Sequence, residues 1–119
     1  MRFQYLLAYK KSFELAMDIY SISKNFPSEE KYSFTDQIRR SSRSVSANIA
    51  EASRKRRYEK HFISKLTDSD AENAETQVWL EYSNACNYIN KSDLEVFTAK
   101  SIEVGKLLNY MMNNPDKFL

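Results

Sequence analysis

The sequence predicts an all-α protein, an antiparallel up-down-up-down four-helix bundle that forms one domain over residues 1–119. A chain of this length is one ordinary domain and is too short for two. It contains one Gly and two Pro, whereas a sheet protein of this size needs many turn residues. Apolar residues make up 42% and charged residues 29%, the balance of a globular protein and not of a disordered one. Long helices joined by few loops follow from these three observations.

The first helix is expected over about residues 3–25. Its apolar side chains recur at alternating three- and four-residue spacing, which is the pattern of a bundle helix. This stripe consists of Leu6, Tyr9, Phe13, Ala16 and Tyr20. Further apolar residues lie outside the stripe, and a helix that is apolar around so much of its circumference usually has more than one neighbour. Pro27 ends the helix, because the residue before a proline is disfavoured in the helical conformation.

The second helix is expected over about residues 34–56, with Ser33 as its N-cap. Its core face is unusually small and polar. Apolar residues recur there every seven positions, with short polar residues between them: Ile38, Val45 and Ala52, then Ser41, Ser42 and Asn48. We interpret Asn48 as a satisfied polar core residue that fixes helix register, as a single buried Asn does in coiled coils.

The third and fourth helices complete the bundle. The third is expected over about residues 58–90, apolar at both ends and polar on nearly every side over residues 67–77. The fourth begins after an N-cap at Asn90 or Ser92, where Ser92 and Glu95 form a capping-box pattern. Gly105 lies level with Thr76 and predicts a close approach of these two helices. Short loops between long helices make neighbours antiparallel.

Antiparallel pairing of the second and third helices predicts ionic contacts. If the chain reverses near residues 56–57, Arg39 and Arg40 lie within a turn of Glu72 and Glu75, and Arg43 approaches Asp70. Guanidinium groups suit paired carboxylates, and such a lattice fixes helix register. The alternative is that these arginines contact phosphates.

Charge is unevenly distributed although the net charge is only +2. Residues 39–60 hold eight basic residues against two carboxylates, a local charge of +6, and residues 61–119 carry −4. The densest basic run lies at the end of the second helix and is followed by Tyr58. It is either a solvated helix end, where basic residues favour the dipole, or a phosphate-contacting patch whose tyrosine stacks on a base. Under the second interpretation the nucleic-acid-binding residues are Arg43, Arg54, Lys55, Arg56, Arg57 and Lys60.

No constellation predicts catalysis, a metal site or a cofactor. The single histidine, His61, lies two residues after Glu59, whereas di-iron bundles need Glu-x-x-His. Cys86 is alone, which excludes an internal disulfide and a multi-cysteine zinc site, and it lies far along the third helix from His61. We interpret it as a small buried apolar residue.

The sequence also predicts a cytoplasmic protein that does not enter a membrane. No segment approaches the roughly 20 apolar residues that a membrane span needs. The apolar run near the N-terminus lacks a small-residue cleavage site and continues into helical periodicity, unlike a signal peptide.

One segment carries a family resemblance. Residues 37–52, QIRRSSRSVSANIAEA, closely resemble the signature of the four-helix-bundle family first noticed in intervening sequences of bacterial large-subunit ribosomal RNA genes, often labelled a ribosomal protein. Asn25-Phe26-Pro27 is similar to the family's first interhelical loop, and Trp79-Leu80 to part of its third helix. Ala52 stands where the family commonly has Gly, which should tighten the end of the second helix. The structural motif residues carried over by position are Gln37, Arg39, Arg40, Asn48, Glu51, Glu72 and Glu75.

The resemblance implies a bundle that often assembles as a homopentamer and has no catalytic residues. Relatives serve as accessory proteins of diversity-generating retroelements, where they bind nucleic acid and a reverse transcriptase. Together with the basic run, this predicts a non-enzymatic homo-oligomer that binds RNA or DNA through the second helix and the following loop. The alternative is an oligomeric scaffold that binds a protein partner and no nucleic acid.

Overall fold

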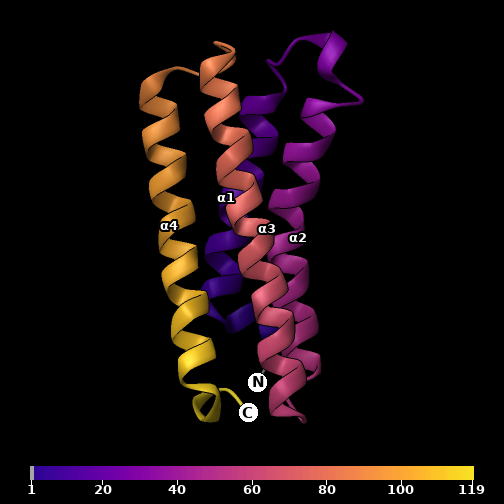
Figure 1. Cartoon of the computed structure of the whole chain (residues 1–119), viewed down its shortest axis with the longest axis vertical. Helices are drawn as coiled ribbons and strands as arrows, with labels where there is room; N and C mark the ends of the chain where they lie inside the picture. The colour runs from indigo at the N-terminus through magenta and orange to yellow at the C-terminus, as the bar shows by residue number, and fades with distance from the viewer. Residues whose placement is uncertain (1) are drawn as a thin grey trace.

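Four long helices, each antiparallel to the next, make up the computed structural model, which describes residues 2–119 (Figure 1). They are α1 (Leu7–Ser23), α2 (Phe34–Arg54), α3 (Glu59–Ala85) and α4 (Lys91–Asn113). Short 3-10 helices η1 (Phe3–Tyr5), η2 (Ser28–Glu30) and η3 (Pro115–Lys117) flank them. The described residues contain no strand and extend over 44 × 25 × 20 Å. The predicted all-α bundle is therefore confirmed.

Helix ends differ from the expected positions for local reasons. The backbone of Leu6 is extended, so η1 is a separate turn and α1 begins only at Leu7. Helix α3 stops at Ala85, earlier than expected, because Asn87 adopts a left-handed conformation with φ 62° and the amide of Tyr88 bonds back to Ser83 O at 2.8 Å. A residue of this conformation commonly ends a helix.

The predicted N-cap positions Ser33 and Asn90 are both confirmed, but only Asn90 caps its helix through the side chain. Asn90 caps α4, because its side chain accepts a hydrogen bond from the backbone amide of Asp93 at 2.8 Å. The capping box that begins at Ser92 is wrong, since Ser92 already lies inside α4. Ser33 makes no side-chain cap for α2; its hydroxyl donates to Glu30 Oε1 at 2.9 Å instead.

The core consists of two apolar clusters, one toward each end of the bundle. The cluster at the end where the two chain termini lie contains Leu6, Ala8, Val45, Ile49, Ala52, Phe62, Leu66, Val104, Leu108 and Met111. The cluster at the other end contains Leu15, Ile19, Phe26, Ile38, Leu80 and Ile89. An interlocked set of aromatic rings from Phe26, Phe34, Trp79 and Tyr88 extends the second cluster.

Between the two clusters lies a layer of buried polar side chains, which we call the polar layer: Ser41, Ser69, Asn73, Thr76 and Ser101. Asn73 donates to Ser101 O and accepts from Ser101 Oγ, both at 2.9 Å, which joins α3 to α4. Ser69 Oγ donates to Val45 O at 2.8 Å, and the Thr76 and Ser41 hydroxyls lie 3.0 Å apart, which joins α3 to α2. Every helix except α1 is therefore held in register by buried hydrogen bonds.

Helix α1 is tied to α4 at its surface. Lys100 Nζ lies 2.6 Å from Asp18 Oδ2 and 3.5 Å from Glu14 Oε1. The hydrogen bond to Asp18 is the main reason that the pKa of Lys100 is raised above its usual range. The ion pairs that attach α1 to α4 are thus contacts that water reaches.

Expectations about three single residues are corrected by the structure. Asn48 is a buried polar residue whose amide is satisfied, as predicted. That amide donates to Ser44 O of the same helix at 2.9 Å, however, so the role of fixing register between helices falls to Asn73. A Cβ on Gly105 would meet Asn73 Nδ2 at an ordinary 3.5 Å, so the approach of α3 and α4 does not require glycine. Cys86 is exposed, because α3 ends just before it.

We predict that Asn73→Ala lowers the free energy of unfolding by about 1–3 kcal/mol, because it removes the acceptor of the buried Ser101 hydroxyl and a donor to the Ser101 carbonyl. Urea denaturation measures the change. The matched variant Asn109→Ala removes an exposed amide from α4 and should cost less than about 0.5 kcal/mol. Equal effects of the two variants would show that the polar layer contributes nothing specific.

Candidate nucleic-acid interface

The densest run of basic residues falls at the end of the bundle where α2 passes into α3; Figure 1 shows this turn of the backbone. Arg54, Lys55, Arg57 and Lys60 are all exposed there. The turn between the helices is tight: the amide of Lys55 donates to Ala52 O at 2.9 Å and that of Tyr58 donates to Lys55 O at 3.0 Å. Because the chain reverses within so few residues, the four cations remain close together.

Arg2 joins this group, and the sequence analysis missed it. Helix η1 places residues 2–4 beside the end of α2, where they enclose a surface hollow of about 260 Å³. The hollow is lined by Arg2, Phe3, Gln4, Ser53, Arg54 and Arg56. The position of Arg2 could have been predicted from the antiparallel pairing of the first two helices. This pairing brings the start of the first helix beside the end of the second. We call the set Arg2, Arg54, Lys55, Arg57 and Lys60 the basic end.

Arg56 differs from its neighbours in the run. Its side chain is half-buried, lines the same hollow and donates from Nη1 to Ser53 Oγ at 3.5 Å. Arg56 therefore helps to shape the turn as well as adding charge.

Tyr58 is the aromatic residue of this end. Its side chain is 60% exposed, and its ring centroid lies 5.6 Å from that of His61 at an interplanar angle of 46°. Histidine packs against one part of the ring while the remainder faces solvent. An exposed ring beside several cations is an arrangement on which an unpaired base can stack.

Arg43 is not part of the basic end. It precedes Arg54 by eleven residues on α2, which corresponds to about 16 Å along a helix. Its guanidinium lies 5.6 Å from the ring centroid of Tyr20 on α1. The expected approach of Arg43 to Asp70 is wrong, because this side chain faces α1 and not α3.

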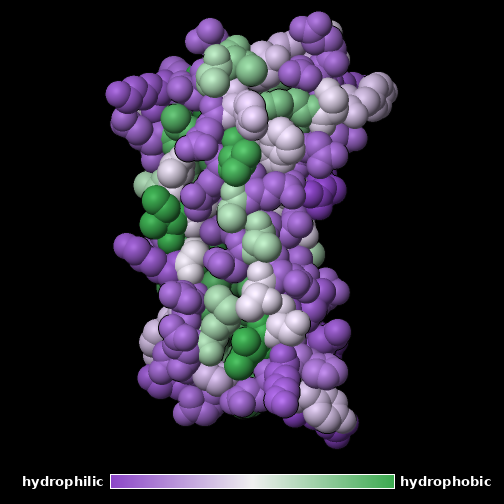
Figure 2. Space-filling model, viewed as in Figure 1, coloured by the Kyte–Doolittle hydropathy of each residue, from purple (hydrophilic) through white to green (hydrophobic). Residues whose placement is uncertain are grey.

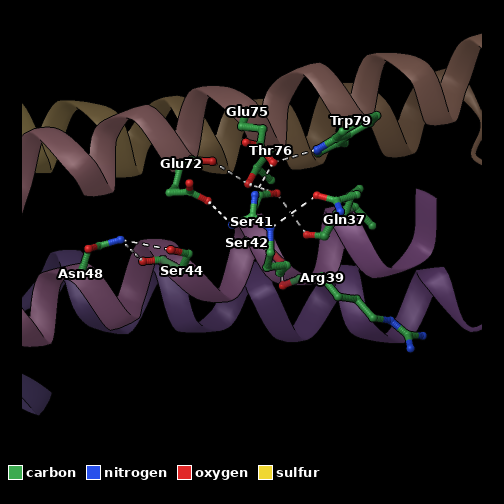
Figure 3. Close-up of polar contacts among 12 residues, drawn as sticks. Gln37, Arg39, Ser41, Ser42, Ser44, Asn48, Glu72, Glu75, Thr76 and Trp79 are labelled. Atoms are coloured by element: carbon green, nitrogen blue, oxygen red, sulfur yellow. Dashed lines mark hydrogen bonds and ion pairs between the residues drawn. The ribbon is translucent and has the colours of Figure 1, made fainter. Parts of the chain in front are cut away.

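Arg39 also faces α1. Its Nε donates to Ser23 Oγ at 2.8 Å and its guanidinium lies 4.9 Å from the Tyr20 centroid. Figure 3 shows the side chain extending away from the carboxylates of α3. The expected pairing of Arg39 with Glu72 or Glu75 is therefore wrong.

Arg40 does form the predicted contacts with α3. Its guanidinium binds Glu72 Oε2 at 3.2 Å and Glu75 Oε2 at 2.7 Å (Figure 3). Gln37 Oε1 accepts from Arg40 Nε at 3.4 Å, and Trp79 Nε1 donates to the same Glu75 oxygen at 3.0 Å. The Arg40 side chain is 51% exposed, so this lattice lies at the surface and is not buried. A second tie between α2 and α3, Glu51 with Lys65 at 3.5 Å, supports the same register.

Residues 2–119 contain no group of three or more His, Cys, Asp or Glu side chains that could hold a metal ion. His61 and Cys86 lie near opposite ends of α3, about 37 Å apart along the helix. Within the same residues, no helix is long and apolar enough to cross a membrane.

Comparison with known proteins gives a family and a solved structure to which this chain is similar. Residues 4–110 match the family described as 23S rRNA-intervening sequence protein. A crystal structure from Bacteroides thetaiotaomicron, described as a protein with unknown function from the S23 ribosomal protein family, is 32% identical to this chain. The similarity covers 95% of this chain and 99% of that one, with a TM-score of 0.81. A search of curated proteins finds no match to this chain.

We predict that a double-mutant cycle of Arg40→Ala and Glu72→Ala gives a coupling energy below about 1 kcal/mol, because water reaches both side chains and screens the pair. Chemical denaturation of the four proteins supplies the value. The cycle of Arg39→Ala with Glu72→Ala is the control and should show no coupling. A coupling of several kilocalories per mole for Arg40 would mean that the pair behaves as a buried one.

Proposed function

This chain belongs to the 23S rRNA-intervening sequence protein family, and from that premise we propose that it is a non-enzymatic homo-oligomer that binds nucleic acid, above all RNA, through its basic end. The observation that carries the proposal is the convergence of five cations and an exposed tyrosine at one end of the bundle. We expect this activity in the cytoplasm.

Electrostatics supports the proposal. None of the ion pairs between residues 2–119 involves a member of the basic end. One carboxylate, that of Glu59, lies within the same stretch and is exposed. The cations are thus not neutralised internally, and binding them to phosphates releases the counterions that nucleic acid condenses. Tyr58 adds a stacking surface that accepts any base.

Assembly would strengthen such binding. Several copies of a modest patch on one particle raise the affinity by about 10²–10⁴ without any new contact, provided that the geometry allows simultaneous engagement. Helix α1 exposes Leu7, Phe13 and Met17, and apolar side chains grouped in this way mark interfaces. Five subunits is the number that the family resemblance favours.

A second candidate is a scaffold that binds a protein, such as a reverse transcriptase, without nucleic acid. The apolar groove between α1 and α2, lined in part by Phe13 and Met17, favours this candidate because a protein partner could occupy it. The two candidates differ in whether the basic end contributes to binding.

We predict that light scattering gives a particle mass several times the 14.0 kDa of one chain, since the apolar face of α1 is covered only in an assembly. A protein that stays monomeric at micromolar concentration would contradict the assembly part of the proposal.

We predict that the protein retains structured RNA on filters at low salt, with little sequence preference, and that retention falls as salt rises. Arg54→Gln combined with Arg57→Gln should weaken binding and reduce the salt slope by roughly two, one for each lost phosphate contact. Circular dichroism should show unchanged helicity, because both side chains are exposed.

The control variant carries Lys31→Gln and Lys91→Gln, which remove the same charge at the opposite end of the bundle. Its affinity and salt slope should stay close to those of the wild type. Equal loss in both variants would indicate an effect of net charge alone. An absence of retention at low salt would favour the protein-binding scaffold.

A further inference from the structure

The α1/α2 side of the bundle carries an apolar groove of about 380 Å³. An aromatic row runs along it: the ring centroids of Phe3 and Tyr9 lie 5.0 Å apart, and those of Tyr9 and Phe13 5.9 Å apart. Opposite this row α2 contributes the short side chains of Ser46, Ala47 and Ala50, and Arg43 lines the groove as well.

The same side becomes cationic further along. Tyr20 is surrounded by Lys24 Nζ at 4.7 Å and by the guanidinium groups of Arg39 and Arg43 at 4.9 and 5.6 Å from its ring centroid. None of these three cations takes part in an ion pair between residues 2–119. Asp36, which lines the adjoining hollow with Arg39 and Arg43, is the one carboxylate beside them there.

The apolar groove and the neighbouring cations together determine which surface can bind the α1/α2 face. Two copies that met α1/α2 to α1/α2 with parallel bundles would bring six cations together, and like charges across an interface disfavour association. With antiparallel bundles, the cations of each copy would lie against the aromatic row of the other without a carboxylate partner. A surface with short apolar side chains and free carboxylates is the complementary one.

The opposite side of the bundle, between α3 and α4, has these properties. It carries a groove of about 330 Å³ lined by Asp70, Ala74, Gln77, Ile102, Gly105 and Lys106, among others. Neither Asp70 nor Glu81 takes part in an ion pair between described residues. Figure 2, which looks onto α3 and α4, shows hydrophobic side chains exposed among hydrophilic ones along this side. Ile102 and Val78 are each 46% exposed.

We propose that the α1/α2 face of one copy binds the α3/α4 face of a second copy of the same chain. The inference rests on the homo-oligomer of the proposed function and identifies the surfaces that form it. A contact between two different faces leaves one face of each kind free, so copies add until the ring closes. With the bundles side by side along the ring axis, rotation about that axis preserves the direction of every bundle, so all basic ends lie on one rim. The assembly therefore becomes a multivalent phosphate-binding surface.

Three matched arginine substitutions test this arrangement by light scattering. Met17→Arg disables the α1/α2 face and Ile102→Arg the α3/α4 face, while Val96→Arg alters α4 outside both grooves; the side chains are 48%, 46% and 50% exposed. We expect the first two variants to be monomeric and the third to assemble like the wild type.

Mixing the two monomeric variants is the decisive step. Met17→Arg keeps an intact α3/α4 face and Ile102→Arg an intact α1/α2 face, so the mixture should form a dimer of twice 14.0 kDa that grows no further. Formation of this dimer also shows that both variants are folded. A mixture that stays monomeric overturns the proposal.

The remaining outcomes separate this inference from the proposed function. Full assembly of either Met17→Arg or Ile102→Arg overturns the pairing of faces but leaves a homo-oligomer in place. A monomeric wild type overturns both.

Discussion

The polar layer in the middle of the bundle is the constraint on which the rest of the structure depends. Apolar side chains tolerate a helix that slides by a turn, because one Leu or Val can replace another against a flat neighbour. Asn73 and Ser101 do not tolerate it, because a slide would leave their buried groups without partners at a cost of about 1–3 kcal/mol for each. Ser69 Oγ donates to Val45 O, so a slide of α3 along α2 would likewise break a buried hydrogen bond. The layer therefore selects one register for three of the four helices.

That register decides where the charged side chains lie. It brings Arg40 level with Glu72 and Glu75, where the guanidinium is neutralised at the α2/α3 surface. It leaves Lys55 and Arg57 in the turn beyond the paired region, where neither takes part in an ion pair between described residues. The fold thus places the arginines in three settings. Arg40 ties α2 to α3, and Arg39 and Arg43 give the α1/α2 side a positive charge around Tyr20. The arginines of the basic end face solvent.

The sequence was sufficient for the fold class and for one ionic contact. The scarcity of Gly and Pro and the heptad patterns predicted four helices. Antiparallel pairing predicted that Arg40 lies level with Glu72 and Glu75 of α3. The level of a residue along the bundle does not, however, say which neighbouring helix its side chain faces. Neighbouring residues diverge by about 100°, so Arg39 and Arg43 point to α1 while Arg40 points to α3. Asn73 was overlooked for a related reason: it lies in a stretch that is polar on nearly every side, so its buried position left no periodic signal. Antiparallel pairing brings the start of α1 near the end of α2, and the separate turn of η1 then places Arg2 at the basic end.

Lysine footprinting tests most directly whether nucleic acid binds at the basic end, because the wild-type protein contains its own controls. The reactivity of each lysine toward an acetylating reagent is compared with and without structured RNA at low salt. Lys55 and Lys60 should lose reactivity when RNA is present, while Lys31 and Lys91 at the opposite end should keep theirs. Protection of Lys31 and Lys91 in place of Lys55 and Lys60, or no change at any lysine, would contradict the assignment.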